Sequence, residues 1–265
     1  MLGRLTGWLG GSSQEQPFPP DAWDSLVARL PLLDGYSPEE LARLRELATE
    51  FLRRKSFHGA GGLEVNDEMR RVVAVQACVP VLNLGLDGYR GWYSVVLYPD
   101  EFVARHEWVD EDGVVHEADR ELSGESWPEG PAIFSWTDVE LGADGEEWGN
   151  VVVHEMAHKL DLLNGEANGM PPLHAGMSRE AWTTAFASAY EDFWHRVDRD
   201  EEVPFDDYAA DDPGEFFAVL SEAFFLHPDD VKDDYPDVYA QLAAFYRQDP
   251  ARRLSLLWRS DEGGG

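Results

Sequence analysis

The stretch at residues 151–161, Val-Val-Val-His-Glu-Met-Ala-His-Lys-Leu-Asp, constrains the fold of this chain most strongly. His154 and His158 are four residues apart, so on an α-helix both imidazoles lie on one face and can bind the same metal ion. Glu155 lies beside that face, where a general base for a metal-bound water belongs. The opposite face carries apolar side chains that the fold has to bury, namely Val152, Val153, Met156, Leu160 and Leu163.

The same His-Glu pair begins two other stretches, which serve as an internal control. His106-Glu107 and His116-Glu117 lack the second histidine that completes the motif. The third occurrence lies in an amphipathic pattern that Asn164-Gly165 brings to an end, as helix stop signals do. We therefore predict a metal-binding helix over residues 150–164.

A catalytic zinc ion has three protein ligands and one open position, so two histidines do not complete the site. The single cysteine, Cys78, excludes a cysteine-rich site and leaves histidine and carboxylate as ligands. Glu215 opens a helical run rich in Phe, Val and Leu, where a buried carboxylate is costly unless it is paired or metal-bound. Glu222, seven residues later on the same face, is the alternative ligand or a supporting partner, and the residues alone leave both assignments open.

Two more side chains are candidates for supporting roles. Tyr208 precedes Glu215 by seven residues, and a tyrosine hydroxyl near a metal can donate a hydrogen bond to the oxyanion of a tetrahedral intermediate. Asp161 follows His158 by about one helical turn and is a candidate partner for the ligands. An acidic residue on the helix surface explains Asp161 nearly as well.

The charge of the chain excludes one large class of partner. The 52 acidic residues outnumber the 21 lysines and arginines, which gives a net charge of -31. A field of this sign repels nucleic acid, so we expect no direct nucleic-acid binding. No run approaches the roughly eighteen apolar residues that a membrane span needs, and the start lacks the features of a signal peptide. We therefore expect a cytoplasmic protein that does not enter membranes.

The order of the predicted elements indicates an α+β fold. Helical periodicity and start signals predict helices at 38–55, 66–82 with a kink at Pro80, 178–197, 215–225 and 236–246. Strands are predicted at 92–98, 114–122 and 132–136. An edge strand of this sheet is expected to pair with an extended peptide, although the sequence does not reveal which strand it is.

A single domain accounts for these elements. We expect a short mixed sheet, followed by a mainly helical half that carries the metal-binding helix. The domain is predicted to cover residues 21–255, with a flexible segment at 1–20 and a flexible tail at 256–265.

Two runs of sequence carry a family resemblance. One is the run from His154 to Asp161 followed by Asn164-Gly165, and the other extends from Tyr208 to Glu222. Shorter stretches match as well, at Cys78–Leu86, Tyr98-Pro99, Gly124–Trp127, Gly130-Pro131 and Gln248–Pro250. Together they resemble the Mlc titration factor A family of zinc peptidases, over about residues 20–255.

The resemblance implies a zincin-like fold related to the catalytic domain of anthrax lethal factor. It implies one zinc ion per chain, held by His154, His158 and Glu215, with Glu155 as the general base and Tyr208 assisting catalysis. It therefore favours Glu215 as the third ligand. It also implies aminopeptidase-type activity on short peptides and, in enterobacteria, binding to the sugar-responsive transcription repressor Mlc.

The expected chemistry is hydrolysis of a peptide bond. Zinc lowers the pKa of its bound water, Glu155 takes the proton and later passes it to the leaving amine, and Tyr208 stabilises the oxyanion. A hypothesis of a different class is a non-catalytic protein that sequesters a transcription repressor and keeps a vestigial metal site. The intact Glu155 argues against it, because binding alone does not need a general base.

Overall fold

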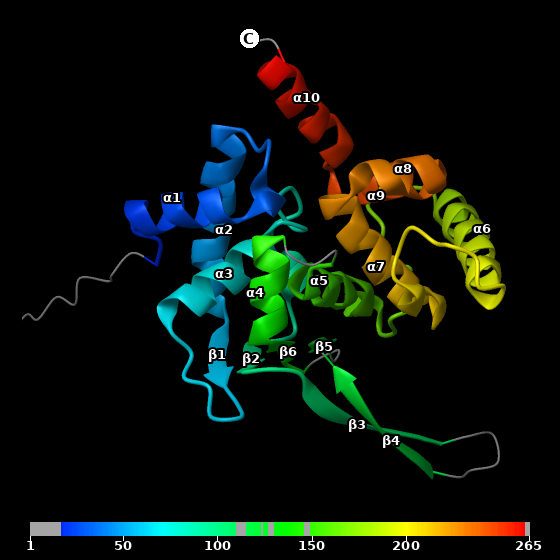
Figure 1. The fold of residues 1–265 in the computed structure, drawn as a ribbon, viewed down its shortest axis with the longest axis horizontal. Helices are drawn as coiled ribbons and strands as arrows, with labels where there is room; N and C mark the ends of the chain where they lie inside the picture. Colours follow the sequence, from blue (N-terminus) through cyan, green and yellow to red (C-terminus); the bar gives the residue numbers. More distant parts are fainter. Residues whose placement is uncertain (1–16, 110–114, 123, 127–129, 146–148, 263–265) are drawn as a thin grey trace, which may run out of the picture.

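Helix α5 (Val151–Asp161) lies at the centre of the fold, in contact with a small sheet and with helices from both halves of the chain (Figure 1). The computed structural model describes residues 17–109, 115–122, 124–126, 130–145 and 149–262. The Asn150 side chain caps α5 by accepting a hydrogen bond from the backbone N–H of Val153 at 3.0 Å. The predicted metal-binding helix is therefore present, and a 3₁₀ turn over Leu162–Asn164 completes the expected range.

The sheet beside α5 is mixed and has the strand order β1-β2-β6-β5. The first three of these strands are parallel, and β5 runs antiparallel to β6. The four strands are β1 (Ser56–Gly59), β2 (Ser94–Tyr98), β5 (Gly124–Ser126) and β6 (Ala132–Ser135). Strands β1 and β5 form the two edges of this sheet, and β5 is the edge next to α5.

A separate antiparallel ribbon consists of β3 (Phe102–Val109) and β4 (Val115–Leu122). It extends away from the rest of the chain in Figure 1. Strand β4 corresponds to the strand predicted at 114–122, although Val114 lies outside the described residues. Strand β3 was not predicted, since its mixture of charged and apolar residues alternates too poorly to be read as a strand.

The helices that surround α5 begin largely where the sequence places its start signals. At the start of α2, for example, the Ser37 side chain accepts from the Glu40 N–H, and the Glu40 carboxylate accepts from the Ser37 N–H. The longer helices are α1 (Pro20–Arg29), α2 (Pro38–Arg54), α3 (Asp67–Cys78), α4 (Trp136–Asp144), α6 (Arg179–Asp198), α7 (Pro213–Leu226), α8 (Pro228–Asp234), α9 (Pro236–Tyr246) and α10 (Pro250–Glu262).

Two predicted boundaries are corrected by the structure. Helix α3 ends at Cys78 instead of continuing with a kink to Leu82, because Pro80 has no N–H to extend the helical ladder. The strand predicted to reach Trp136 ends at Ser135, whose side chain caps α4. Helix α10 runs to Glu262, into the segment 256–265 whose flexibility stays a prediction.

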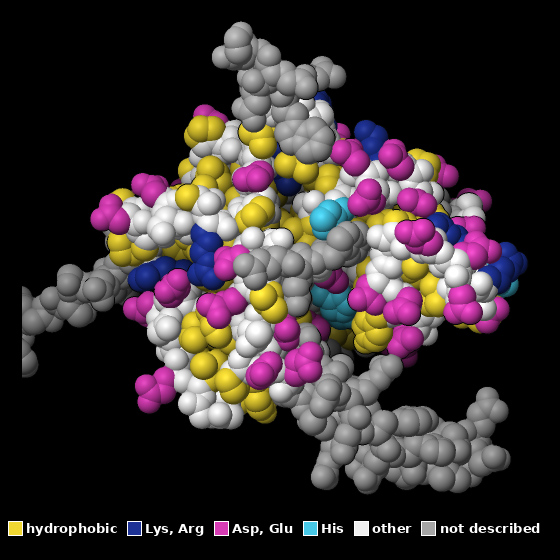
Figure 2. All heavy atoms as spheres, viewed as in Figure 1, with side chains coloured by type: hydrophobic (Ala, Val, Ile, Leu, Met, Phe, Trp, Pro, Cys, Tyr) yellow, Lys and Arg dark blue, Asp and Glu magenta, His cyan; other side chains and the backbone are white. Residues whose placement is uncertain are grey.

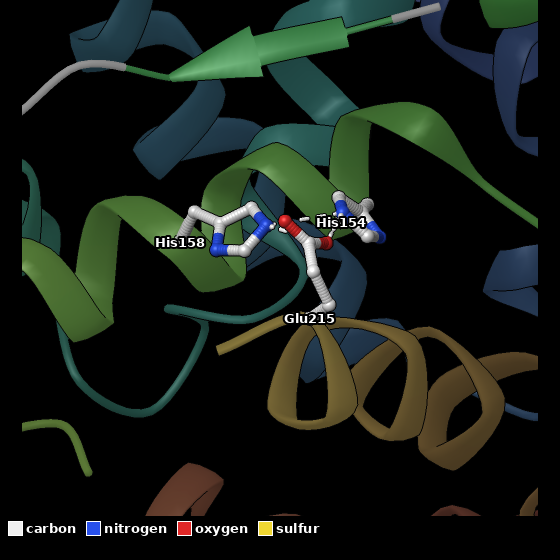
Figure 3. Close-up of side chains that lie close together, drawn as sticks. All are labelled: His154, His158 and Glu215. Atoms are coloured by element: carbon white, nitrogen blue, oxygen red, sulfur yellow. Dashed lines mark hydrogen bonds and ion pairs between the residues drawn. The ribbon is translucent and has the colours of Figure 1, made fainter. Parts of the chain in front are cut away.

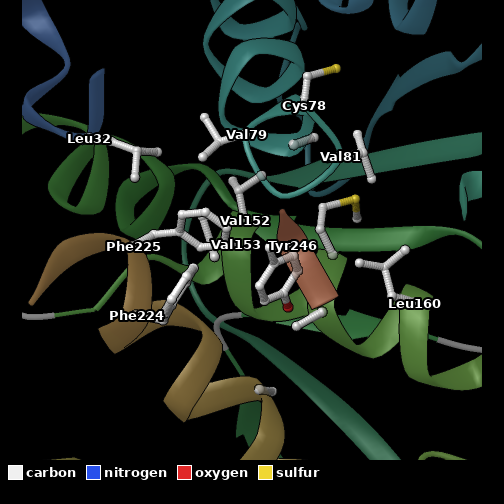
Figure 4. Packing of buried hydrophobic residues seen from close by; sticks show 14 of the residues in the cluster. Leu32, Cys78, Val79, Val81, Val152, Val153, Leu160, Phe224, Phe225 and Tyr246 are labelled. Atoms are coloured by element: carbon white, nitrogen blue, oxygen red, sulfur yellow. The ribbon is translucent and has the colours of Figure 1, made fainter. Parts of the chain in front are cut away.

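The apolar back of α5 is buried between α3 and α7 (Figure 4). Val152 and Val153 have no exposed surface, and neither do Cys78 of α3 and Phe224 of α7. Complete burial of a side chain of this size contributes about 1.5–3 kcal/mol to stability. This packing fixes α5 against α7, and it thereby sets the distance between the two helices that carry the predicted metal ligands.

The surface shows the excess of acidic residues. Asp and Glu side chains are spread over the face drawn in Figure 2, while Lys and Arg occupy few places on it. In the part of the chain that the structure describes, no helix is both long enough and apolar enough to cross a membrane.

Candidate metal centre

Three side chains from α5 and α7 converge on one point (Figure 3). Glu215 Oε2 lies 3.1 Å from His154 Nε2 and 3.2 Å from His158 Nε2, and the two nitrogens are 3.1 Å apart. Two ligand atoms at about 2.0–2.1 Å from a tetrahedral zinc ion lie roughly 3.3–3.4 Å apart. The spacing and chemistry of the three atoms therefore fit one zinc ion. Among the described residues, no other group of three His, Cys, Asp or Glu side chains converges in this way.

The start of α7 places Glu215 at this point. The Asp212 side chain caps the helix by accepting from the backbone N–H groups of Gly214 at 2.7 Å and Glu215 at 3.0 Å. Pro213 occupies the first helical turn, where its missing N–H has no cost. The short run Asp-Pro-Gly-Glu therefore fixes the residue at which α7 begins, and with it the position of the Glu215 carboxylate.

Glu222, the alternative third ligand, lies behind His154. Its Oε1 is 2.5 Å from His154 Nδ1, and its Oε2 accepts from the Asn150 N–H at 2.7 Å. A carboxylate on Nδ1 orients the ring and leaves Nε2 directed toward a metal. Gly149 permits this approach, because a Cβ at that position would lie 2.9 Å from Glu222 Oε2. The structure thus places Glu215 among the converging atoms and Glu222 outside them.

The acidic neighbours change the protonation of the cluster. Burial disfavours a charged imidazole, but Glu222 and Glu215 outweigh it and raise the pKa of His154 well above 6.5. Burial would raise the pKa of Glu215, yet its contacts with both histidines hold that pKa well below the usual range. A metal ion that binds here therefore displaces a proton from His154.

Glu155 lies against the edge strand of the sheet. It is buried, and a Cβ at Gly124 of β5 would come within 2.6 Å of Glu155 Oε1 and 2.8 Å of the Val151 side chain. Only glycine allows the backbone of β5 to pass so close. The predicted general base therefore lies directly against the backbone of β5 at Gly124.

Tyr208 is also brought to the site, on the 3₁₀ helix Asp207–Ala210. Its ring centroid lies 6.4 Å from that of His154, with the two rings tilted by 33°. The Tyr190 hydroxyl of α6 donates to the Ala210 carbonyl at 3.0 Å, which holds this short helix in place. Asp206 caps the same helix by accepting from the Tyr208 N–H.

Asp161 is completely buried, and it contacts a loop instead of a ligand histidine. Its Oδ2 accepts from the backbone N–H of Gly169 at 2.7 Å. Burial raises the pKa of Asp161 to about 6, against the opposing effect of this hydrogen bond. Nδ1 of His158 has no hydrogen-bond partner within the described residues. The structure therefore places Asp161 near the predicted ligands, without a hydrogen bond to them among the described contacts.

Several residues at the site were given no role from the sequence, among them Asn150 and Gly124, although Gly124 lies in one of the stretches that carry the family resemblance. Lys159 is another: its Nζ donates to the carbonyls of Gly130 at 3.0 Å and Pro131 at 3.2 Å, just before β6. The same nitrogen lies 5.0 Å from the Trp92 ring centroid, and Lys55 Nζ lies 3.4 Å from that centroid. Two sequence signals point to Lys159: its place in the run from His154 to Asp161, and the scarcity of lysine, three in the whole chain.

Comparison with known proteins identifies the family. The model of the glucose-regulated metallo-peptidase M90 family matches residues 8–247. Mlc titration factor A of Pectobacterium atrosepticum is 36% identical over 259 residues, which is 96% of each chain. Mlc titration factor A of Salmonella arizonae is 38% identical over 237 residues, 88% of this chain and 92% of its own. The resemblance predicted from the motifs is confirmed, and the chain belongs to the glucose-regulated metallo-peptidase M90 family.

Proposed function

We propose that this protein is a zinc-dependent peptidase with a zincin-like site. The observation that carries the proposal is the convergence of two imidazole nitrogens from α5 and one carboxylate oxygen from α7. The buried Glu155 lies on α5 next to the first of these histidines. A set of His154, His158 and Glu215 leaves one position open for water or substrate, as catalytic zinc sites do. The edge strand that runs past Glu155 supports the zincin-like assignment.

The residues divide the chemistry among them. A bound zinc ion would lower the pKa of a coordinated water and polarise a peptide carbonyl. Glu155 accepts the proton from the water and returns it to the leaving amine. Tyr208 donates a hydrogen bond to the oxyanion that develops on the carbonyl. An extended peptide adds to the outer edge of β5, which would bring its backbone past Glu155.

The Glu155→Gln variant tests this assignment. Glutamine has nearly the same shape but cannot take a proton, so the variant should bind zinc as the wild type does and lose peptide hydrolysis. A peptide-library digest followed by mass spectrometry, run with wild type and variant and with and without a chelator, tests whether cleavage requires Glu155 and whether it requires the metal. Undiminished cleavage by the variant, or cleavage that the chelator does not affect, would refute the role of Glu155 or of the metal.

We further propose that cleavage is of the aminopeptidase type and acts on short peptides, as the family resemblance implies. Pairs of peptides with free and acetylated amino termini distinguish this from internal cleavage. The free peptides should lose residues one at a time from the amino terminus, and the acetylated ones should stay intact. Cleavage of both forms at the same internal bond would show an endopeptidase.

A second proposed function is binding of a transcription repressor of the Mlc type. It is supported by the relatives at 36–38% identity, which are named Mlc titration factor A. A pull-down with the Glu155→Gln variant separates binding from hydrolysis, because the variant should capture the repressor without peptidase activity. If the wild type captures the repressor but cleaves no peptide in the library, the non-catalytic alternative holds.

A further inference from the structure

We propose that Asp161 is a positioning residue that fixes Glu215 at the metal site through the backbone of residues 167–169. The connection starts on α5, next to the ligand histidines, and ends on the first turn of α7. Its effect on hydrolysis rests on the proposed function, whereas its effect on metal binding can be measured separately.

The first part of the connection is the hydrogen bond from the Gly169 N–H to Asp161 Oδ2, at 2.7 Å. Asp161 has no exposed surface, and a buried carboxylate is costly unless it accepts hydrogen bonds. A hydrogen bond to a charged acceptor is about twice as strong as one between neutral groups. Because Asp161 is only three residues beyond His158, the loop is attached to the helix that carries two of the ligands.

The second part is direct backbone contact between the loop and α7. Gly169 has a φ of +74°, and a Cβ on it would lie 2.4 Å from the Pro213 carbonyl oxygen. A Cβ on Gly214 would likewise lie 2.9 Å from the Ala167 carbonyl oxygen. The two backbones therefore touch with no side chain between them, and Glu215 is the next residue. A shift of the loop acts directly on the turn that carries Glu215.

Trp182 of α6 holds the loop from the other side. Its Nε1 donates to the Gly169 carbonyl at 2.9 Å, so both polar backbone groups of Gly169 are fixed. The indole stacks on Phe186 at 4.4 Å between ring centroids and is tilted against Phe217 of α7 at 6.0 Å. The loop is therefore anchored to α5 and α6 before it meets α7.

The start of α7 needs this support more than the rest of the helix does. Its later turns are buried against α5, whereas Glu215 lies in the first turn and its side chain is 17% exposed. The first turn of a helix lacks part of its backbone hydrogen bonds and opens most readily. The contacts that join Asp161 and Trp182 through residues 167–169 to this end of α7, here called the brace, keep the Glu215 carboxylate within reach of both histidines.

Cobalt binding tests the inference, since visible absorption of bound Co²⁺ reports the ligand geometry. Metal-free wild type should bind one Co²⁺, and the Asp161→Ala variant should bind it roughly 10- to 100-fold more weakly, with an altered spectrum. Asp161→Asn keeps an oxygen for the Gly169 N–H and should recover most of the affinity. As a matched control, Tyr36→Phe removes a buried hydrogen bond of 3.0 Å to Gln248 outside the brace, and it should leave the spectrum unchanged.

The outcomes separate this inference from the proposed function. A folded Asp161→Ala variant with wild-type affinity and spectrum would overturn the positioning role alone. A wild type that binds no Co²⁺ would overturn both the metal site and the brace. If Asp161→Ala does not fold, Trp182→Phe decides, because it removes the other hydrogen bond to Gly169. That variant should weaken Co²⁺ binding in the same direction, and unchanged binding would refute the inference.

Discussion

Replacement of Glu222 by glutamine should weaken zinc binding without removing a ligand. The carboxylate lies 2.5 Å from His154 Nδ1 and also accepts from the Asn150 N–H at 2.7 Å. If the amide oxygen of a glutamine faces Asn150, its NH₂ group faces Nδ1, which must then act as an acceptor. The ring proton moves to Nε2, the atom needed for the metal. If the amide is turned round, the NH₂ group instead opposes the N–H of Asn150.

The size of the effect follows from this conflict. Loss of the partner of a ligand histidine typically costs 10- to 100-fold in metal affinity, which corresponds to about 1.4–2.7 kcal/mol. Competition with a chromogenic chelator measures the zinc affinity of wild type and variant under the same conditions. Glu50→Gln is a matched control, because Glu50 pairs with Arg54 on the surface and should not affect the metal. A Glu222→Gln affinity within twofold of wild type would refute the reasoning.

Three further predictions concern the same site. Glu215→Ala should lose zinc as measured by elemental analysis, and full occupancy in this variant would make Glu222 the third ligand. Gly124→Ala should lower kcat at least tenfold and cost about 1–3 kcal/mol of stability, because the added Cβ meets Glu155 2.6 Å away. Thermal melting and steady-state kinetics measure the two effects, and an unaltered kcat would place β5 farther from the base. Zinc binding should release a proton from His154, since its pKa is raised. The apparent affinity should therefore rise with pH while His154 is protonated, and level off only above its raised pKa. Calorimetry in buffers of different ionisation enthalpy counts the proton, and an affinity independent of pH below that level would contradict the assignment.

The helix that carries His154 and His158 could be predicted because its signals are local. The spacing of His154 and His158 follows from helical periodicity, and the start of α7 follows from the run Asp-Pro-Gly-Glu. The roles of Glu215 and Glu222 could not be separated in this way. Both lie on one face of α7, and which of them reaches the metal depends on how α7 crosses α5.

The sheet was less predictable, for a physical reason. Strand β5 has three residues and β1 has four, and segments this short show no measurable alternation of apolar and polar residues. Their pairing depends on partners far along the chain, as when β1 joins β2. The need for glycine at position 124 is visible only when β5 is placed against Glu155.

The two lysines around Trp92 are shielded from amine-reactive labels in the folded protein. Lys55 and Lys159 are buried, whereas Lys232, the third lysine of the chain, is exposed. A short treatment of the native protein should therefore mark Lys232 and spare the other two. Modification at position 159 requires Lys159 to leave the carbonyls before β6, and modification at position 55 requires Lys55 to leave the Trp92 ring. The order in which the two positions become labelled would thus show whether, during unfolding, α5 separates from the start of β6 before or after Lys55 leaves the Trp92 ring.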